Sequence, residues 1–401
     1  MEREQFYANA RRDIAGPLDG VTVVEATTTW AGPMAGCILG DYGATVIKVE
    51  HPDGEVCRRM PPMIPDTNLT VAHETVNRNK LNVSMDLRRE DGRDAFLKIC
   101  ETADIVIENF RPGTLAKWGI GYDDVAKVKP DIIYLSVSGF GQYGTLSHRV
   151  GYDPLAQNYC GWTSLNGEPG SGSTKAPTFL ADDLGGMHGA MAVMAALRHR
   201  DQTGEGQHVD VALVDSLLYQ SNGNPTSGAL GVPLEKMGNQ FSLAAPINVY
   251  DTLDERVYAG VLLDSHWAAL CELMGTEHLA QLTLLERIEQ RDVVDGALAA
   301  YCASQASATL VATFSDLGLP AVAVNTYAQL SQEEHIHSRD MLPSVELADG
   351  TIVPLTAPPA KFSRTPVGIR SRAATLGEHN QEVLGALGYS AADIAALQKQ
   401  E

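Results

Sequence analysis

Two adjacent carboxylates, Asp182 and Asp183, are the residues whose type and position most clearly allow chemistry. From Leu184 onward the apolar side chains and alanines predict one long buried helix, so both acids fall at the capping position just before its first turn. On spacing alone, a helix cap is the commoner interpretation. The other is a carboxylate nucleophile, because free backbone N–H groups and the positive end of the helix dipole stabilise the ionised form. Gly185 and Gly186 cost helix stability and are expected where a backbone or ligand comes close, which favours the nucleophile somewhat.

Composition sets outer limits on the function. A chain of 401 residues predicts two domains, and 44% hydrophobic residues without a long apolar run predict a soluble globular protein with no membrane role. A net charge of −20 argues against nucleic acid as a partner, so an anionic ligand would need a local cluster of cations and N–H groups. The N-terminal residues show no secretory pattern, and a cytoplasmic location is expected.

Metal, disulfide and serine-hydrolase chemistry are not expected. The 6 cysteines lie far apart without a C-x-x-C pair and are interpreted as reduced thiols. His335 and His337 would share one face of a strand, but no third ligand is near them in the sequence. Ser136 and Ser138 lack the G-x-S-x-G pattern of a nucleophilic serine.

Strands are predicted to alternate with helices along the first half of the chain. Apolar and β-branched runs predict strands at residues 21–25, 44–50, 81–87, 105–108 and 132–137. This alternation is typical of an α/β fold with a parallel, doubly wound sheet, whose ligands bind at the carboxyl ends of the strands. The first loop lacks the G-x-G-x-x-G pattern, and Pro33 removes an N–H donor, which argues against a dinucleotide enzyme.

Composition also predicts the domain organisation. Residues 216–240 become rich in Gly, Pro and Asn and are interpreted as a linker. The predicted parts are a large Rossmann-like domain of residues 1–215 with 345–401, a smaller α/β domain of residues 241–330, and a second linker of residues 331–344.

Five separated blocks resemble the family III CoA-transferases, which include formyl-CoA, carnitine, bile-acid and benzylsuccinate CoA-transferases and the α-methylacyl-CoA racemases. The blocks are W-A-G-P continuing to V-E (30–50), E-N-F-R-P-G (108–113), S-G-F-G (138–141), D-x-x-x-G continuing to T-G-E-G-Q (182–207), and F-S-x-T-P with L-G-E-H-N (362–380). Each block alone is weak. In this order over nearly the whole chain they indicate the family, and they say less about the substrate.

The resemblance implies a nucleophile and a reaction. The Asp of the D-x-x-x-G motif falls on Asp182, which would attack a donor acyl-CoA to give a mixed anhydride. The released CoA would convert the anhydride to an aspartyl-CoA thioester, and an acceptor carboxylate would then take the CoA. Only a carboxylate side chain can become first an anhydride and then a thioester. Backbone N–H groups near Gly185 and Gly186 are the predicted oxyanion donors.

The resemblance also implies the substrate contacts. CoA contacts are expected at His51, Met85, Leu87, Arg88, Asn109, Phe110, Arg111 and Lys117, with Trp30 and Ala31 beside the nucleophile. Arg88, Arg111 and Lys117 would supply positive charge, although without the resemblance each would be interpreted as a solvated surface charge. His51 departs from the family, where arginine is common, and Trp30 stands where some relatives have a polar residue and would shape an acyl pocket. CoA thioesters would be substrates, with no tightly bound cofactor.

One triplet separates the two chemistries of the family. Racemases that resemble this chain have Gly-His-Asp, whereas this chain has Gly151-Tyr152-Asp153. Tyrosine is a poor base at neutral pH but a good hydrogen-bond donor, which favours a transferase, although Tyr152 could equally be an ordinary half-buried tyrosine. A racemase-like enzyme stays an alternative, and so does a partner subunit of a heteromeric transferase.

The resemblance further implies an assembly and a substrate class. Two chains would interlock as rings, as a homodimer or as a heterodimer with a paralogue. The partners expected are an acyl-CoA, with succinyl-CoA as the candidate donor, and a small carboxylic acid whose identity the residues do not indicate.

Overall fold

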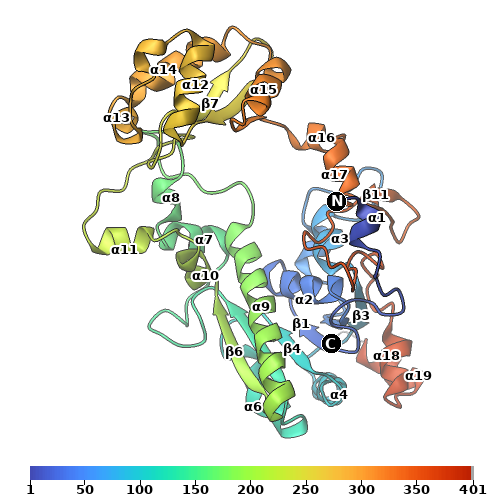
Figure 1. Cartoon of the computed structure of the whole chain (residues 1–401). Coiled ribbons are helices and arrows are strands. Elements are labelled where there is room, and N and C mark those ends of the chain that lie inside the picture. Colours follow the sequence, from blue (N-terminus) through green and yellow to red (C-terminus); the bar gives the residue numbers. More distant parts are fainter. Residues whose placement is uncertain (399–401) are drawn as a thin grey trace. The chain divides into compact units, whose positions relative to one another are not determined.

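A parallel sheet lies at the centre of the larger of the two units into which the chain divides. The computed structural model describes residues 1–398, and within them the sheet pairs six strands in the order β3-β2-β1-β4-β5-β6, all parallel (Figure 1). The strands are β1 (Thr22–Ala26), β2 (Thr45–Glu50), β3 (Lys80–Ser84), β4 (Ile105–Glu108), β5 (Ile133–Ser138) and β6 (Gln207–Ala212). The predicted α/β fold with a parallel, doubly wound sheet is confirmed. The strand order reverses between β1 and β4, so a ligand site is expected beyond their carboxyl ends.

Helices cover both faces of this sheet, which explains why its strands are mostly apolar. One face carries α2 (Ala31–Asp41), α7 (Asp153–Tyr159), α9 (Leu180–Thr203) and α10 (Leu213–Tyr219). The other carries α4 (Glu90–Cys100), α5 (Thr114–Lys117), α6 (Tyr122–Val128), α18 (Asn380–Ala386) and α19 (Ala391–Leu397). Shorter elements of this unit are α1 (Arg3–Phe6), η1 (Val56–Arg59), α3 (Val71–Asn77), α17 (Glu334–Ser338), β10 (Ser344–Glu346) and β11 (Ile352–Pro354).

The C-terminal segment covers the edge strand β3. The N–H of Asn82 donates to Nδ1 of His379 at 3.1 Å, and the N–H of Ser84 donates to Oδ1 of Asn380 at 2.8 Å. In return, the His379 N–H donates to the Asn82 carbonyl at 3.0 Å. These bonds satisfy backbone groups that an edge strand would otherwise leave unpaired. The L-G-E-H-N block therefore has a structural role, because it forms hydrogen bonds with the backbone of the edge strand.

The smaller unit comprises residues 163–174 and 227–333. Its antiparallel sheet pairs β7 (Ile247–Asp251), β8 (Arg256–Gly260) and β9 (Ala321–Ala323), and its helices are η2 (Glu277–Leu279), α12 (Asp264–Met274), α13 (Leu284–Glu289), α14 (Arg291–Cys302), α15 (Ser307–Asp316) and α16 (Tyr327–Leu330). Two further helices, α8 (Trp162–Leu165) and α11 (Asn224–Ala229), each span a unit boundary in the sequence.

Three further points bear on the sequence analysis. The domain boundaries given there stay a prediction, and residues 399–401 of the predicted large domain lie outside the described residues. His335 and His337 lie on helix α17, so their placement on a strand was wrong.

Among the described helices none is individually long and apolar enough to cross a membrane. Helices α14 and α15, which are bent against each other, reach that length and composition only together.

Glycines allow α9 to approach α2 and the sheet closely. A Cβ on Gly186 would lie 2.8 Å from both the Ala31 carbonyl oxygen and the Met34 Cβ. A Cβ on Gly189 would lie 2.9 Å from the Leu135 side chain. These distances leave no room for a methyl group, so packing outweighs the low helix propensity of glycine here.

Gly186→Ala is expected to lower the free energy of unfolding by about 1–3 kcal/mol, because the added methyl overpacks the contact between α9 and α2. The control is Gly385→Ala in α18, where a Cβ would meet only the flexible side chain of Gln381. Better helix propensity should then raise stability by about 0.5–1 kcal/mol. Urea unfolding of both variants tests the difference, and equal stability would show that the close approach at Gly186 is not needed.

Candidate active site

The predicted nucleophile lies inside a helix and not before it. Helix α9 begins at Leu180, so Asp182 and Asp183 occupy its first turn, and their predicted placement at the cap was wrong. The N-cap residue makes no side-chain capping bond; the N–H of Ala181 donates instead to Oδ1 of Asp153 at 2.7 Å. Helix α9 can begin at Leu180, earlier than predicted, because the Asp153 carboxylate of another helix accepts one of the free N–H groups of its first turn.

Asp153 is held in this position by a second buried side chain. It is the first residue of α7 and is 2% exposed, and its Oδ2 accepts from Nε2 of Gln157 at 2.8 Å. Gln157 in turn accepts the N–H of Ala176 at 2.8 Å. The pair joins the beginnings of α7 and α9. Sequence reasoning chose the neighbouring Tyr152 and missed Asp153, although an Asp followed by Pro154 is a recognisable helix start.

Three carboxylates therefore share a small region at the start of α9. Asp182 is 8% exposed, and its pKa is raised to about 7, first by burial and then by the charges of Asp153 and Asp183. Burial also raises the pKa of Asp183, but the Trp30 Nε1–H donates to its Oδ1 at 2.6 Å and opposes the rise. Within residues 1–398 no such donor reaches the Asp182 carboxylate. A poorly solvated carboxylate of this kind is a good nucleophile once ionised.

The loop that carries Trp30 is held in a strained conformation. Thr29 has a φ of 68°, in the left-handed region that a β-branched residue rarely adopts. Its N–H donates to Oε2 of Glu55 at 2.7 Å. The Asn109 amide brackets Thr28, accepting from its N–H at 2.9 Å and donating to its carbonyl at 2.7 Å. Such strain costs about 1–3 kcal/mol and persists only where surrounding bonds impose it. Asn109, predicted as a CoA contact, thus also holds this loop.

A buried ion cluster, formed by Glu25, Lys48, Glu55 and Lys80, underlies the loop. Oε1 of Glu25 lies 3.3 Å from Nζ of Lys48 and 2.8 Å from Nζ of Lys80, and Lys48 lies 3.1 Å from Glu55. Burial lowers the pKa of Lys48, but the carboxylates of Glu55 and Glu25 outweigh it and raise that pKa; for Lys80 burial prevails and lowers the pKa. This cluster was not predicted from the sequence. The clue to it in the sequence is one acidic and one basic residue inside otherwise apolar strands. Glu25 and Lys48 are these residues, and they lie opposite each other as register partners in β1 and β2.

A cavity of about 390 Å³ opens beside Asp182 at the carboxyl ends of β4 and β5. Its lining includes Val137 and Leu213, which make part of its wall apolar. The predicted site residues that it brings together are Trp30, Ala31, Asn109, Phe110, Arg111, Tyr152 and Asp182. Arg149, which the sequence analysis did not consider, lines it as well. We refer to it below as the acyl cavity, after the acyl pocket that the family resemblance predicts beside Trp30.

A second cavity of about 460 Å³ gathers most of the remaining predicted contacts, His51, Met85, Leu87, Arg88 and again Phe110. Met85 and Leu87 are buried in the apolar core, so they can contribute only its floor. Phe110 and Thr28 line both cavities, and the two therefore adjoin.

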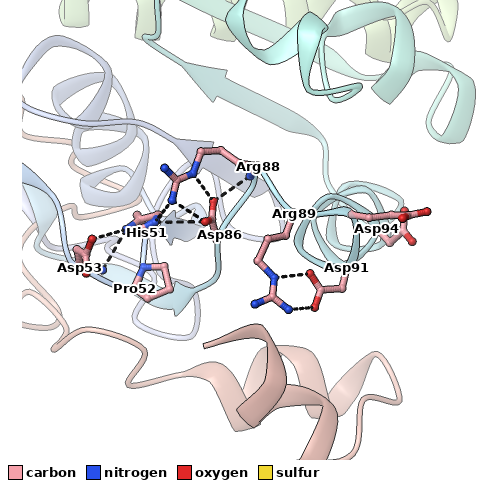
Figure 2. Close-up of a pocket in the computed structure, with 9 residues that line it drawn as sticks. His51, Pro52, Asp53, Asp86, Arg88, Arg89, Asp91 and Asp94 are labelled. Carbon is pink, nitrogen blue, oxygen red and sulfur yellow. Dashed lines mark hydrogen bonds and ion pairs between the residues drawn. The ribbon is translucent and has the colours of Figure 1, made fainter. Parts of the chain in front are cut away.

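Outside the second cavity lies an open hollow in which arginines are paired with aspartates (Figure 2). Arg88 forms a two-point ion pair with Asp86, at 2.8 and 2.6 Å, and approaches Nε2 of His51 at 2.7 Å. The Arg88 hydrogen bonds hold the pKa of Asp86 at about 2. Arg89 pairs in the same way with Asp91, at 3.0 and 2.6 Å. An anionic ligand would have to compete with these carboxylates for the arginines.

The remaining predicted residues lie elsewhere. Gly185 and Gly186 are absent from the lining of the acyl cavity and pack against Leu213 and α2. Their N–H groups lie beyond the first turn of α9, where helical hydrogen bonds engage them, so the predicted oxyanion role does not fit this geometry. Lys117 is exposed at the end of α5 and lines neither cavity. Among the described residues no group of three or more His, Cys, Asp or Glu side chains could hold a metal ion.

Comparison with known proteins finds similarity over nearly the whole chain. A family model described as CoA-transferase family III matches residues 18–380. The succinyl-CoA–L-malate CoA-transferase beta subunit of Chloroflexus aurantiacus is 35% identical over 381 residues, which cover 92% of this chain and 93% of that protein. The succinate–glutarate CoA-transferase of Agrobacterium fabrum is 32% identical over 382 residues, with 92% and 96% covered. The crystal structure of a CaiB/BaiF family protein from Brucella suis is 31% identical, with a TM-score of 0.83, and the match covers 93% of this chain and 100% of that one.

Asp182→Asn is expected to stabilise the folded protein at neutral and higher pH. The folded-state pKa of Asp182, about 7, exceeds its ordinary value of 3.8, so wild-type stability should fall as pH rises between these values, by about 1.4 kcal/mol per pH unit at most. Asparagine keeps the shape without the buried charge. Its advantage should be small near about pH 4 and reach roughly 2–4 kcal/mol near about pH 8. Urea unfolding at both pH values measures this, and an advantage that does not grow with pH contradicts the raised pKa.

Asp153→Asn is expected to lower the pKa of Asp182 by roughly one unit, because a nearby negative charge is removed while the amide oxygen can still accept from Ala181. Asp183→Asn is the matched control and should lower it less, since Asp183 is the smaller of the two charge effects. The measurement is an NMR titration of aspartate carboxyl carbons. An unchanged midpoint in Asp153→Asn would show that the two carboxylates are not coupled.

Proposed function

The chain belongs to family III of the CoA-transferases and is a CoA-transferase; from this premise we propose that it moves CoA between small dicarboxylic acids through a covalent intermediate on Asp182. The observation that carries the proposal is the Asp182 carboxylate itself. It is nearly buried, has a pKa of about 7, and lines the acyl cavity next to the cavity that holds the residues expected to contact CoA.

Each step of the proposed reaction balances without an added proton. An Asp182 oxygen attacks the thioester carbonyl of the donor, the C–S bond breaks, and CoA leaves as a thiolate from the mixed anhydride. The thiolate then attacks Cγ of Asp182, which releases the donor acid as a carboxylate and leaves an aspartyl-CoA thioester. The acceptor carboxylate attacks the same carbon and expels the thiolate, which gives a second mixed anhydride between Asp182 and the acceptor. The thiolate then attacks the acceptor carbonyl of this anhydride, which forms the product acyl-CoA and frees the Asp182 carboxylate. Low exposure of Asp182 supports this route, because water would hydrolyse each intermediate.

The dicarboxylic substrate class rests on the relatives and on the cavity. Malate, succinate and glutarate, the acids in the names of the two similar transferases, are all small dicarboxylic acids. A cavity of about 390 Å³ is at the small end of ligand sites. CoA would extend from it past Phe110 toward His51 and Arg88.

Transfer is favoured over racemisation, and an assembly is proposed with it. Tyr152, 54% exposed at the start of α7, lines the acyl cavity where related racemases carry their histidine base. A tyrosine there can donate a hydrogen bond to a substrate carbonyl but is a poor base. The proposed assembly is an interlocked homodimer, or a heterodimer with a paralogue, for which the name of the beta-subunit relative gives support.

The proposal predicts a covalent modification. After incubation with succinyl-CoA, mass spectrometry should detect CoA on the peptide containing Asp182, and hydroxylamine should convert it to a hydroxamate. Asp182→Asn should lose the modification completely. Asp183→Asn, the matched control, should keep it, because the nucleophile is untouched and the asparagine amide oxygen can still accept the hydrogen bond from Trp30.

Two outcomes would contradict the proposal. Modification that survives in Asp182→Asn would place the nucleophile elsewhere. Absence of modification by any acyl-CoA, together with exchange of an α-proton of an acyl-CoA with solvent, would favour the racemase instead.

A further inference from the structure

Charge in the acyl cavity is distributed differently from charge in the rest of the protein. The chain carries a net charge of −20, yet the charged residues that line this cavity are Asp182 and two arginines, Arg111 and Arg149. With Asp182 ionised, the cavity lining is cationic. Its two positive charges exceed the one negative charge of Asp182, so the lining can also neutralise a negatively charged ligand.

These two arginines differ from those of the neighbouring hollow. Arg88 and Arg89 form two-point ion pairs with aspartates, whereas in residues 1–398 neither Arg111 nor Arg149 has a side-chain hydrogen bond or ion pair. An unpaired guanidinium in an acidic protein is available for a ligand, and its fork matches a carboxylate with two parallel hydrogen bonds.

The two arginines come from different loops, Arg111 from the loop after β4 and Arg149 from the loop before α7. Both line the acyl cavity and neither lines the second one, but Arg111 directly follows Phe110, which lines both, and is an expected CoA contact. Arg149 belongs to the segment 149–152, which lines the acyl cavity and is absent from the second one. With Arg111 expected to contact CoA, Arg149 is left for the acyl group.

The backbone that follows the exposed Arg149 is anchored near Asp182 at two points. The backbones of Gly139 and Gly151 touch so closely that a Cβ on Gly151 would lie 2.4 Å from the Gly139 Cα. Two residues further on, Asp153 caps the helix that carries Asp182. The segment can thus hold one end of a small substrate at a set place while the other end reacts.

We propose that Arg149 binds the distal carboxylate of dicarboxylic substrates and makes the enzyme select them over monocarboxylic acids of the same length. The inference rests on the proposed function and deepens it. Donor and acceptor occupy the acyl cavity in turn, so one arginine serves both halves of the exchange. The reacting carboxyl group lies at Asp182 while the second one pairs with Arg149.

The test compares Arg149→Gln and Arg149→Lys with wild type in each half-reaction. The first half is the rate of Asp182 modification by succinyl-CoA against butyryl-CoA. The second is the discharge of the aspartyl-CoA form by glutarate against pentanoate. Arg149→Gln should lower kcat/KM for the dicarboxylic member about 10- to 100-fold, the value of a charged two-point hydrogen bond, and change the monocarboxylic member little. Arg149→Lys should recover part of the loss, and Arg111→Gln should affect both members alike through the KM for the CoA thioester.

The outcomes separate this inference from the proposed function. Equal loss for both members in Arg149→Gln, or a wild-type enzyme that accepts both equally, overturns the role of Arg149 while CoA transfer stands. If no acyl-CoA modifies Asp182 in the wild type, the proposed function fails, and the inference fails with it.

Discussion

The carboxylate of Glu25 lies between two ammonium groups inside the parallel sheet. The geometry of the loop after β1 and of the start of α2, near Asp182, depends on this contact. Lys80 donates to Glu25 and also to the carbonyl of Pro33 at 2.8 Å, in the first turn of α2. Lys48 donates to the carbonyl of Thr27 at 3.1 Å, where the loop after β1 begins. Strands, loop and helix are therefore joined through one buried ion cluster. Removing a single member would leave an uncompensated charge in the core, which is far more costly than the cluster is stabilising.

The ion cluster holds a loop that would not adopt its conformation unaided. Glu55, a member of the cluster, accepts the N–H of Thr29 and so helps to impose a left-handed backbone on a threonine. The next residue, Trp30, is thereby directed to Asp183, the neighbour of Asp182. The loop strain and the raised pKa of Asp182 are both unfavourable for folding, and the well-packed sheet beneath them offsets these costs.

Paired and unpaired arginines distinguish the two parts of the site. In the hollow near His51 each arginine has an aspartate partner, so an anion that binds an arginine there must displace its aspartate. In the acyl cavity the guanidiniums meet no carboxylate within the described residues, and a substrate carboxylate would be their first partner. An acidic protein can in this way bind anions at one place without attracting them over its whole surface.

The sequence by itself determined the architecture of the sheet and the identity of the candidate nucleophile. Buried parallel strands must be continuous apolar runs between helices, and that pattern is local, so the strands and the loops at their carboxyl ends could be predicted. Asp182 could be chosen over Asp183 because the family resemblance places the Asp of the D-x-x-x-G motif there, and a carboxylate suits the chemistry that the motif implies. Trp30 lines the cavity beside Asp182, and its role in shaping an acyl pocket stays a prediction.

Only the tertiary structure decided how these residues are held. Helix α9 starts at Leu180 because Asp153, a residue of another helix, accepts one of its N–H groups. Glu25 and Lys80 belong to strands that are not adjacent in the sheet, and Asn109 reaches Thr28 from the loop after β4. Gly186, interpreted from the sequence as a site residue, packs against α2 instead. Each of these outcomes depends on which distant group satisfies a buried charge, a free N–H or a close contact, and a local sequence pattern carries no information about that partner.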